Sequence, residues 1–139
     1  MNPRSVHRVK DTAARAVTSS RIPNGLHVTT CAKVNLSLEV IRRRDDGYHE
    51  IETILQCIDL ADQIEIELTS DARIEIACDR PEIPTDERNL CHRAIVAMRP
   101  LAGASLGARM RIEKRIPSGA GLGGGSTNAA RILLAVCRG

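Results

Sequence analysis

The stretch PSGAGLGGGSTNAA, residues 117–130, decides how this sequence is interpreted. Five of seven consecutive positions in it are glycine: Gly119, Gly121, Gly123, Gly124 and Gly125. Glycines leave the backbone N–H groups uncovered and permit positive φ, so successive amides can turn inward around an anion. The apolar residues that follow have helical spacing, and the positive end of that helix would add to the attraction. The segment predicts a phosphate-binding loop that leads into a helix.

The glycine stretch has three other possible interpretations. It is not a Walker loop, because no Gly-Lys-Ser/Thr ends it. It matches the dinucleotide fingerprint G-x-G-x-x-G, but the strands before it look antiparallel and the ribose-binding acidic residue expected about 20 residues further on is absent. A flexible linker is the third, although linkers seldom separate a strand from a strongly apolar helix.

Alternation of apolar and polar residues predicts an antiparallel sheet. The clearest strand is KVNLSLEVIRR, residues 33–43, and others are predicted over 50–58, 63–68, 73–77 and 109–116. One face of the first strand would be buried and the other wet. Its apolar side carries Val34, Leu36, Leu38 and Val40.

Two helices are predicted, over residues 89–101 and 126–137. Asn89 is a candidate N-cap for the first, and Pro100 argues for an early end. The second is apolar almost all round, so we expect further protein to pack against it. The residues expected to face inward are Leu90, Ala94, Ile95, Ala97 and Met98 in the first helix and Ala129, Ile132, Leu133 and Val136 in the second.

Charge divides the chain into two parts. Residues 1–27 carry five basic residues and one acidic residue, and we expect a basic, disordered extension there, with organelle targeting as a lesser possibility. Residues 28–139 carry 15 basic and 16 acidic residues, which gives no case for a nucleic-acid surface. No apolar run approaches the ~20 residues that span a bilayer. The five cysteines form no C-x-x-C pair, so buried free thiols in a reducing cytoplasm are expected.

Two motifs upstream of the loop could carry chemistry. In AKVNL, residues 32–36, Lys33 and Asn35 project from one face of a strand and could orient a hydroxyl and neutralise phosphate charge. In DGYH, residues 46–49, an aromatic ring and an imidazole leave a turn together, which suits stacking on a base and hydrogen bonding to its edge. Taken alone, each motif fits a solvated strand face or a surface turn better.

Together, AKVNL, DGYH, Asn89-Leu90 and the glycine stretch resemble the GHMP kinase superfamily in order and approximate spacing, over about residues 28–137. The glycine loop is specific to the superfamily. DGYH followed by a strand points to the branch that acts on 4-diphosphocytidyl-2-C-methyl-D-erythritol. The resemblance implies an α+β fold, a ribosomal protein S5 domain 2-like N-terminal domain with a mainly antiparallel sheet and helices packed on one face.

The resemblance also implies an activity, ATP-dependent phosphorylation of the 2-hydroxyl of that substrate in the non-mevalonate isoprenoid (terpenoid) pathway. ATP and Mg²⁺ would be the cofactors, with no residue assigned to the metal, and neither nucleic acid nor membrane would be a partner. Lys33 would lie beside the attacking hydroxyl as the catalytic residue, Asn35 would place the substrate, and Tyr48 and His49 would bind its cytosine. The residues wrapping the ATP phosphates would be Pro117, Ser118, Gly119, Ala120, Gly121, Leu122, Gly123, Gly124, Gly125, Ser126 and Thr127.

The sequence departs from the family pattern in two places. Cys31 stands where the family usually has Pro, which alters the start of the strand but removes no catalytic atom. The family's catalytic aspartate lies in a Gly-Ala-Asp-Val-Pro-like segment beyond the glycine helix, and these 139 residues contain none. We therefore expect residues 28–139 to be an incomplete GHMP kinase ATP-binding domain, inactive in isolation.

Two alternatives stay open. The chain could belong to another GHMP small-molecule kinase, in which case Tyr48 and His49 would be incidental. It could also be a non-enzymatic S5-like module that binds nucleotide or RNA, although near-neutral residues 28–139 and the scarcity of aromatic residues argue against RNA.

Overall fold

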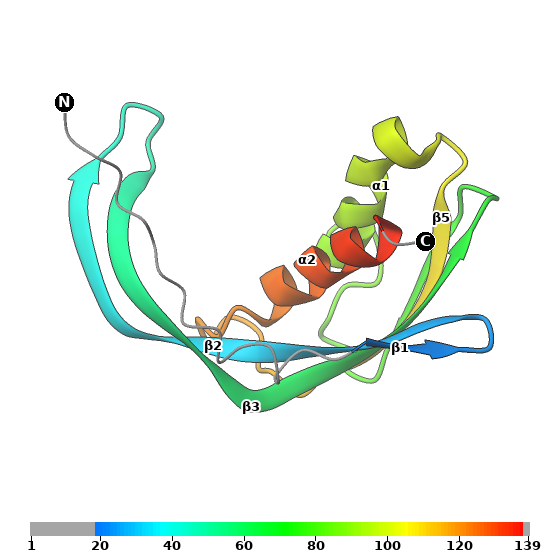
Figure 1. Cartoon of the computed structure of the whole chain (residues 1–139), viewed down its shortest axis with the longest axis horizontal. Coiled ribbons are helices and arrows are strands. Elements are labelled where there is room, and N and C mark those ends of the chain that lie inside the picture. Colours follow the sequence, from blue (N-terminus) through cyan, green and yellow to red (C-terminus); the bar gives the residue numbers. More distant parts are fainter. Residues whose placement is uncertain (1–18, 138–139) are drawn as a thin grey trace.

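The computed structural model describes residues 19–137. It is an α+β fold, as the sequence predicts, with a five-stranded sheet and two helices (Figure 1). The elements are β1 (Ser19–Ile22), β2 (Gly25–Arg43), β3 (His49–Thr69), β4 (Ile74–Cys78), α1 (Leu90–Ala102), β5 (Gly107–Glu113) and α2 (Gly124–Val136).

The strands lie in the order β1-β2-β3-β5-β4. All neighbouring pairs are antiparallel except β4 and β5, which are parallel and are connected through α1 as a βαβ unit. Both helices lie over the same side of the sheet, which agrees with the expected arrangement (Figure 1). Along β3 and β5 the even-numbered residues face the helices: Ile64, Ile66, Ala108, Met110 and Ile112.

The core between sheet and helices is aliphatic. Ile64, Ile95 and Ile132 are fully buried and come from β3, α1 and α2 respectively. Burial of each such side chain stabilises the fold by about 1.5–3 kcal/mol. The core therefore fixes β5 and α2, the two elements that the glycine segment joins, relative to each other.

The predicted boundary at residue 27 was wrong for part of the extension. Residues 19–22 form β1 and pair with β2 in a hairpin whose turn is Pro23-Asn24. Proline sets φ for the first turn position, and the following Asn and Gly favour turns, so this signal was readable in the sequence. Residues 1–18 lie outside the described residues.

The predicted strands 50–58 and 63–68 are one strand, β3. The prediction left residues 59–62, which include Asp59 and Asp62, outside both strands. The strand continues because the Asp62 carboxylate finds hydrogen-bond donors inside the fold.

A long two-stranded arm, residues 36–55, extends from the sheet as the outer halves of β2 and β3 and the turn between them (Figure 1). The expected burial of one face was wrong here. Leu36, Leu38 and Val40 are more than half exposed, because neither helix lies over this part of the ribbon (Figure 1). Three register shifts interrupt the pairing of β2 with β3, and such bulges bend and twist a ribbon.

The helices differ from prediction in their ends and faces. Pro100 does not end α1 early, since the helix continues to Ala102 and the N–H of Gly103 donates to the Arg99 carbonyl. Asn89 caps α1 as predicted, its side chain accepting a hydrogen bond from the Cys91 N–H. Of the residues predicted to face inward, four are buried: Ala94, Ile95, Ile132 and Val136. Met98 and Ala129 are half-buried. The prediction was wrong for Leu90, Ala97 and Leu133, which are exposed.

Candidate phosphate-binding site

The glycine segment forms an open loop followed by α2. We call residues 117–123 the phosphate loop, and its first five residues are exposed. Gly119, Gly121 and Gly123 have φ of 73°, 73° and 76°, while the residues between them have negative φ. Alternation of left- and right-handed backbone turns successive N–H groups toward one side and makes an anion-binding concavity.

The start of α2 is left free to meet an anion. Gly123 is the N-cap and offers no side-chain hydrogen bond, and the first turn contains no acidic residue. The Thr127 hydroxyl, expected to donate to phosphate, instead donates to the carbonyls of Gly123 and Gly124. Ser126 is exposed at the same helix end. The positive end of the helix is therefore presented chiefly by backbone N–H groups.

Lys33 is joined directly to the phosphate loop. Its N–H donates to the Leu122 carbonyl at 3.0 Å, and its Nζ donates to the Gly121 carbonyl at 2.7 Å. The same Nζ donates to Asn35 Oδ1 at 2.9 Å, so Lys33 and Asn35 lie on one face as predicted. Two of the bulges in β2 flank these residues. The arrangement places a cation and an amide at the edge of the loop.

A buried polar network lies under the loop and was not predicted. Asp62, fully buried on β3, receives hydrogen bonds from Lys114 Nζ at 2.6 Å and from Asn128 Nδ2 at 2.9 Å. Its other oxygen receives the N–H groups of Arg115 and Ile116, each at 2.8 Å. The Thr30 hydroxyl donates to Asn128 Oδ1. The network is satisfied, as burial of charged groups requires.

The segment that leads from β5 into the loop is also bound by a residue outside the Asp62 network. The Lys114 N–H donates to Asp79 Oδ1 at 2.8 Å, and this hydrogen bond lowers the pKa of that carboxyl. Hydrogen bonds to the ionised form have this effect because they stabilise the anion.

A hollow of about 150 Å³ opens beside the loop. Ser118 and Gly125 border it on the loop side, and Pro84, Leu90 and Cys91 border it on the side of α1. Burial raises the pKa of the Cys91 thiol to about 12, so this sulfur is a neutral part of the wall. A mainly apolar hollow next to an anion site suits a ring attached to a phosphate chain.

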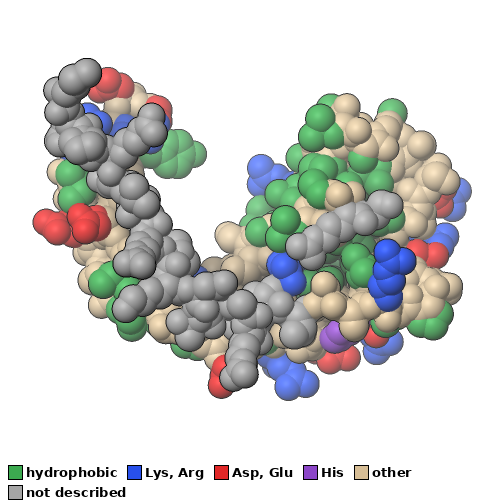
Figure 2. All heavy atoms as spheres, viewed as in Figure 1, with side chains coloured by type: hydrophobic (Ala, Val, Ile, Leu, Met, Phe, Trp, Pro, Cys, Tyr) green, Lys and Arg blue, Asp and Glu red, His purple; other side chains and the backbone are tan. Residues whose placement is uncertain are grey.

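Tyr48 and His49 are not brought to the phosphate loop. They lie at the tip of the arm, where Tyr48 is 75% exposed and its N–H donates to Asp46 Oδ1. Figure 1 shows this tip, between β2 and β3, raised on one side of an open space with α2 on the other, and the space-filling view shows the same separation (Figure 2). The described residues thus form two separate groups, one of Lys33, Asn35 and the loop, and one of Tyr48 and His49.

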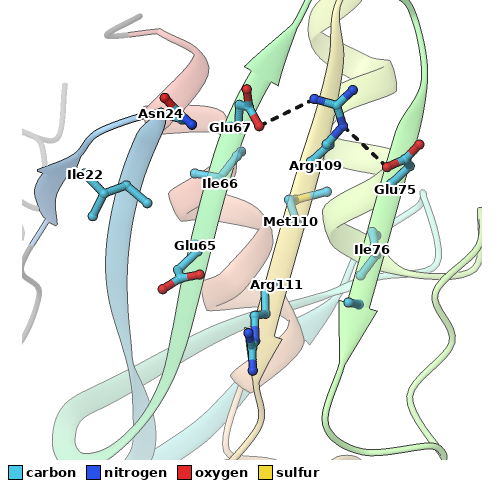
Figure 3. Close-up of a pocket in the computed structure, with 11 residues that line it drawn as sticks. Ile22, Asn24, Glu65, Ile66, Glu67, Glu75, Ile76, Arg109, Met110 and Arg111 are labelled. Carbon is cyan, nitrogen blue, oxygen red and sulfur yellow. Dashed lines mark ion pairs between the residues drawn. The ribbon is translucent and has the colours of Figure 1, made fainter.

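A larger hollow of about 400 Å³ lies on the face of the sheet away from the helices. Figure 3 shows Arg109 of β5 there between Glu67 of β3 and Glu75 of β4, with ion pairs of 3.6 and 3.5 Å. These side chains are about half exposed, and pairs of this kind contribute little to stability. Three Glu and two Arg side chains line it, so this hollow is slightly acidic and is a weaker candidate for a phosphate site than the loop.

Sequence reasoning missed Asp62, Lys114 and Asn128. A signal was present, because residue 62 continues the even-numbered core face of β3, and residue 114 continues that of β5. Opposite charges at core-facing positions of two neighbouring strands predict a buried pair once the strand register is known. The register of β3 against β5 is known only from the structure, which pairs Gln63 with Glu113.

Within residues 19–137, no three His, Cys, Asp or Glu side chains gather in a way that could hold a metal ion. In the same part of the chain, neither helix has the length and apolar character needed to cross a bilayer.

Comparison with known proteins identifies the family. The family model "GHMP kinases N terminal domain" matches residues 89–138. The chain is 48% identical over 111 residues to a 4-diphosphocytidyl-2-C-methyl-D-erythritol kinase of Chlorobaculum parvum, covering 80% of this chain and 38% of that protein. A relative of the same name from Alkaliphilus metalliredigens is 50% identical over 102 residues, covering 73% of this chain and 35% of that protein.

Comparison with solved structures leads to the same group of kinases. The crystal structure of a 4-(cytidine 5'-diphospho)-2C-methyl-D-erythritol kinase superposes with a TM-score of 0.64 at 42% identity, covering 81% of this chain and 40% of the other. The chain thus spans well under half the length of the relatives that it matches. The fold, the glycine loop and these matches show that the chain belongs to the GHMP kinase family, and that within it the chain is similar to the 4-diphosphocytidyl-2-C-methyl-D-erythritol kinases.

Proposed function

We propose that the chain supplies the ATP-binding part of a kinase that phosphorylates the 2-hydroxyl of 4-diphosphocytidyl-2-C-methyl-D-erythritol, a step of non-mevalonate isoprenoid synthesis. The observation that carries the proposal is the contact of Lys33 with the phosphate loop through the Leu122 and Gly121 carbonyls. This contact supports the proposal because an ammonium group at the edge of the loop could neutralise the charge of a phosphoryl group held there. The names of the relatives supply the choice of substrate.

In this proposal the loop N–H groups and the start of α2 hold the ATP phosphates, and the hollow beside α1 takes the attached ring. Lys33 neutralises the charge that develops on the phosphoryl oxygens and orients the attacking hydroxyl, with Asn35 fixing the ammonium. The hydroxyl oxygen forms a bond to the γ-phosphorus as the bond to the β-phosphate oxygen breaks, and ADP leaves with that electron pair. The hydroxyl proton must pass to a base, which the resemblance assigns to an aspartate segment not found among these 139 residues.

Mg²⁺ is part of the proposal as a group that arrives with the nucleotide. The described residues contain no carboxylate cage, and the exposed hydroxyls at the loop are those of Ser118 and Ser126, since Thr127 donates to helix carbonyls. Such a donor set fits Mg²⁺, which usually keeps several waters and is held largely by substrate phosphates. Bound there, Mg²⁺ would neutralise phosphate charge.

Tyr48 and His49 are proposed to bind cytosine across the open space between the arm and α2. Their exposure leaves the ring and the imidazole available for stacking and for hydrogen bonds to a base edge. The proposal includes a cytoplasmic location, supported by the five cysteines, none of which forms a disulfide. It assigns no role to nucleic acid or membrane.

Binding of two ligands to the 139-residue chain tests the proposal. We expect ATP to perturb the amide signals of the phosphate loop, and cytidine diphosphate to bind with an affinity that falls about tenfold in His49→Ala, since a lost hydrogen bond to a ligand has this size. Glu52→Ala, an exposed change further along the same strand, is the matched control. Unchanged cytidine binding in His49→Ala would favour another GHMP small-molecule kinase. Absence of ATP binding together with tight, salt-sensitive RNA binding would favour a non-enzymatic module.

We also propose that the 139 residues alone do not turn over substrate. The reason is the missing aspartate segment, without which the hydroxyl proton has no assigned acceptor. A coupled assay for ADP release in the presence of both substrates measures this, and substrate-dependent ADP release above background would refute it.

A further inference from the structure

The Asp62 carboxylate connects both ends of the phosphate loop. Through one oxygen it accepts the N–H groups of Arg115 and Ile116, which immediately precede Pro117. Through the other it accepts the side chain of Asn128, in the second turn of α2 after the loop. One buried group therefore sets the distance between the chain that enters the loop and the helix that leaves it.

Lys114 completes this connection on the inner side. Its Nζ donates to Asp62 at 2.6 Å and to the Ile116 carbonyl at 2.7 Å, and the residue is only 7% exposed. The ammonium lies directly below the first residue of α2, because a Cβ added at Gly124 would come within 2.8 Å of it. The same Cβ would come within 2.9 Å of Ile116 Cγ2. The start of α2 and the residues that follow β5 therefore pack directly against the ion pair of Asp62 and Lys114.

From these contacts we propose that Asp62 is a positioning residue for the phosphate loop: with Lys114 and Asn128 it holds the loop in its anion-binding shape before any ligand arrives. The proposal rests on the proposed function only in assigning phosphate to the loop. Asp62 is buried and does not touch the ligand, so it acts through the backbone of residues 115–124. Prior organisation of this kind raises affinity because the loop need not be ordered upon binding.

Two variants separate the two connections. Asp62→Asn removes the charge that binds Lys114 and leaves one acceptor oxygen in place of two. The ammonium of Lys114 attracts that oxygen, so the N–H groups of Arg115 and Ile116 then face an amide NH2 that cannot accept. The lost charge also weakens the hold on the ammonium that lies below the start of α2. Asn128→Ala keeps the Asp62–Lys114 pair and breaks the link to α2, together with the hydrogen bond that Asn128 accepts from Thr30. Asp59→Asn is the matched control, because Asp59 lies on the same strand and is exposed. Asn128→Ala also serves if Asp62→Asn fails to fold.

The first measurement is amide hydrogen exchange of the ligand-free 139-residue chain. We expect Asp62→Asn to speed exchange at Arg115 and Ile116 about tenfold or more, the size of one lost hydrogen bond, and to loosen the start of α2. Asn128→Ala should loosen the start of α2 and leave Arg115 and Ile116 unchanged. Asp59→Asn should alter neither. Unaltered exchange around the loop in both Asp62→Asn and Asn128→Ala would overturn the proposal, whether or not ATP binds.

The second measurement compares ATP with adenosine. A positioning role predicts that Asn128→Ala weakens ATP binding about tenfold while adenosine binding is unchanged, because only ATP uses the loop. Equal weakening of both ligands would show general damage and would contradict the proposal. Failure of the unaltered chain to bind ATP would refute the proposed function, while the exchange measurement would still decide the role of Asp62.

Discussion

The phosphate loop and the arm show two ways of presenting functional groups. The loop stands on a network in which every partner of Asp62 is buried or backbone, and it is ordered by contacts among β3, β5 and α2. The arm is a ribbon of two strands whose apolar residues are largely exposed, including Ile54 at 61%. A two-stranded ribbon is marginally stable by itself. The comparison shows that the phosphate loop is fixed by buried contacts, whereas the tip of the arm, which carries Tyr48 and His49, has few contacts to hold it in place.

Thiol reactivity should show the largest contrast. Burial raises the Cys91 pKa from 9.0 to about 12, so at a given pH the folded protein holds about 1000-fold less of its thiolate than an unperturbed thiol would. We expect iodoacetamide at pH 8 to modify Cys91 about that much more slowly in the folded chain than in urea, as measured by mass spectrometry. Cys57, half-buried where the arm leaves the sheet, should react in the folded chain. Equal rates of modification at Cys91 and Cys57 in the folded chain would contradict this expectation.

Loss of the buried pair should be the next largest effect. Asp62→Asn leaves the Lys114 ammonium buried without its counter-charge, and breaking such a pair costs about 3–5 kcal/mol. Urea denaturation measures the free energy of unfolding. In the arm, Glu50→Gln removes the exposed partner of Arg42 and should cost less than about 1 kcal/mol. A similar loss from both substitutions would mean that the two regions are equally organised.

Glycine substitution should have an intermediate effect that differs by region. Gly121 and Gly47 both have positive φ, 73° and 86°, and an added Cβ would meet nothing at either site. Alanine at either position should therefore cost about 1–2 kcal/mol of local strain. Gly121→Ala should weaken ATP binding, and Gly47→Ala should leave it unchanged, as titration calorimetry can measure. Equal loss of ATP affinity would place the arm in the phosphate site.

The smallest effect is expected on the arm surface. Ile54→Ser removes an exposed apolar side chain and should change the free energy of unfolding by less than about 0.5 kcal/mol. Ile64→Ala, on the same strand but fully buried, should cost about 2–5 kcal/mol. A large cost at Ile54, measured by the same denaturation experiment, would show that the arm is covered in solution.

The sequence predicted the parts of this fold that local pattern controls. Strand alternation, the Asn89 cap and the glycine loop with its helix follow from neighbouring residues, and the structure has them. Prediction failed where distant residues decide the outcome. Asp62 lies between two predicted strands, and the partners that hold it inside the fold, Lys114 and Asn128, lie 52 and 66 residues away. Leu36 looked like core because alternation indicates a face, not whether anything covers it.

The site was predicted in part for the same reason. Lys33 and Asn35 share a face because they are two apart on a strand, and the structure links them to the loop. The roles of Lys33, Asn35, Tyr48, His49 and residues 117–127 in binding remain predictions. Thr127 shows what local reasoning omits, since its hydroxyl donates to carbonyls of its own helix.

The span of the Asp62 network has a consequence for how the protein is made. A ribosome delivers the chain from the N-terminus, so the Asp62 carboxylate emerges long before Lys114 and Asn128. Until those residues arrive, the carboxylate has none of its final partners and favours water over the interior. Strand β3 can then settle into the sheet fully only once the glycine segment has been synthesised. Completion of the fold and completion of the phosphate loop would thus be a single late event during synthesis.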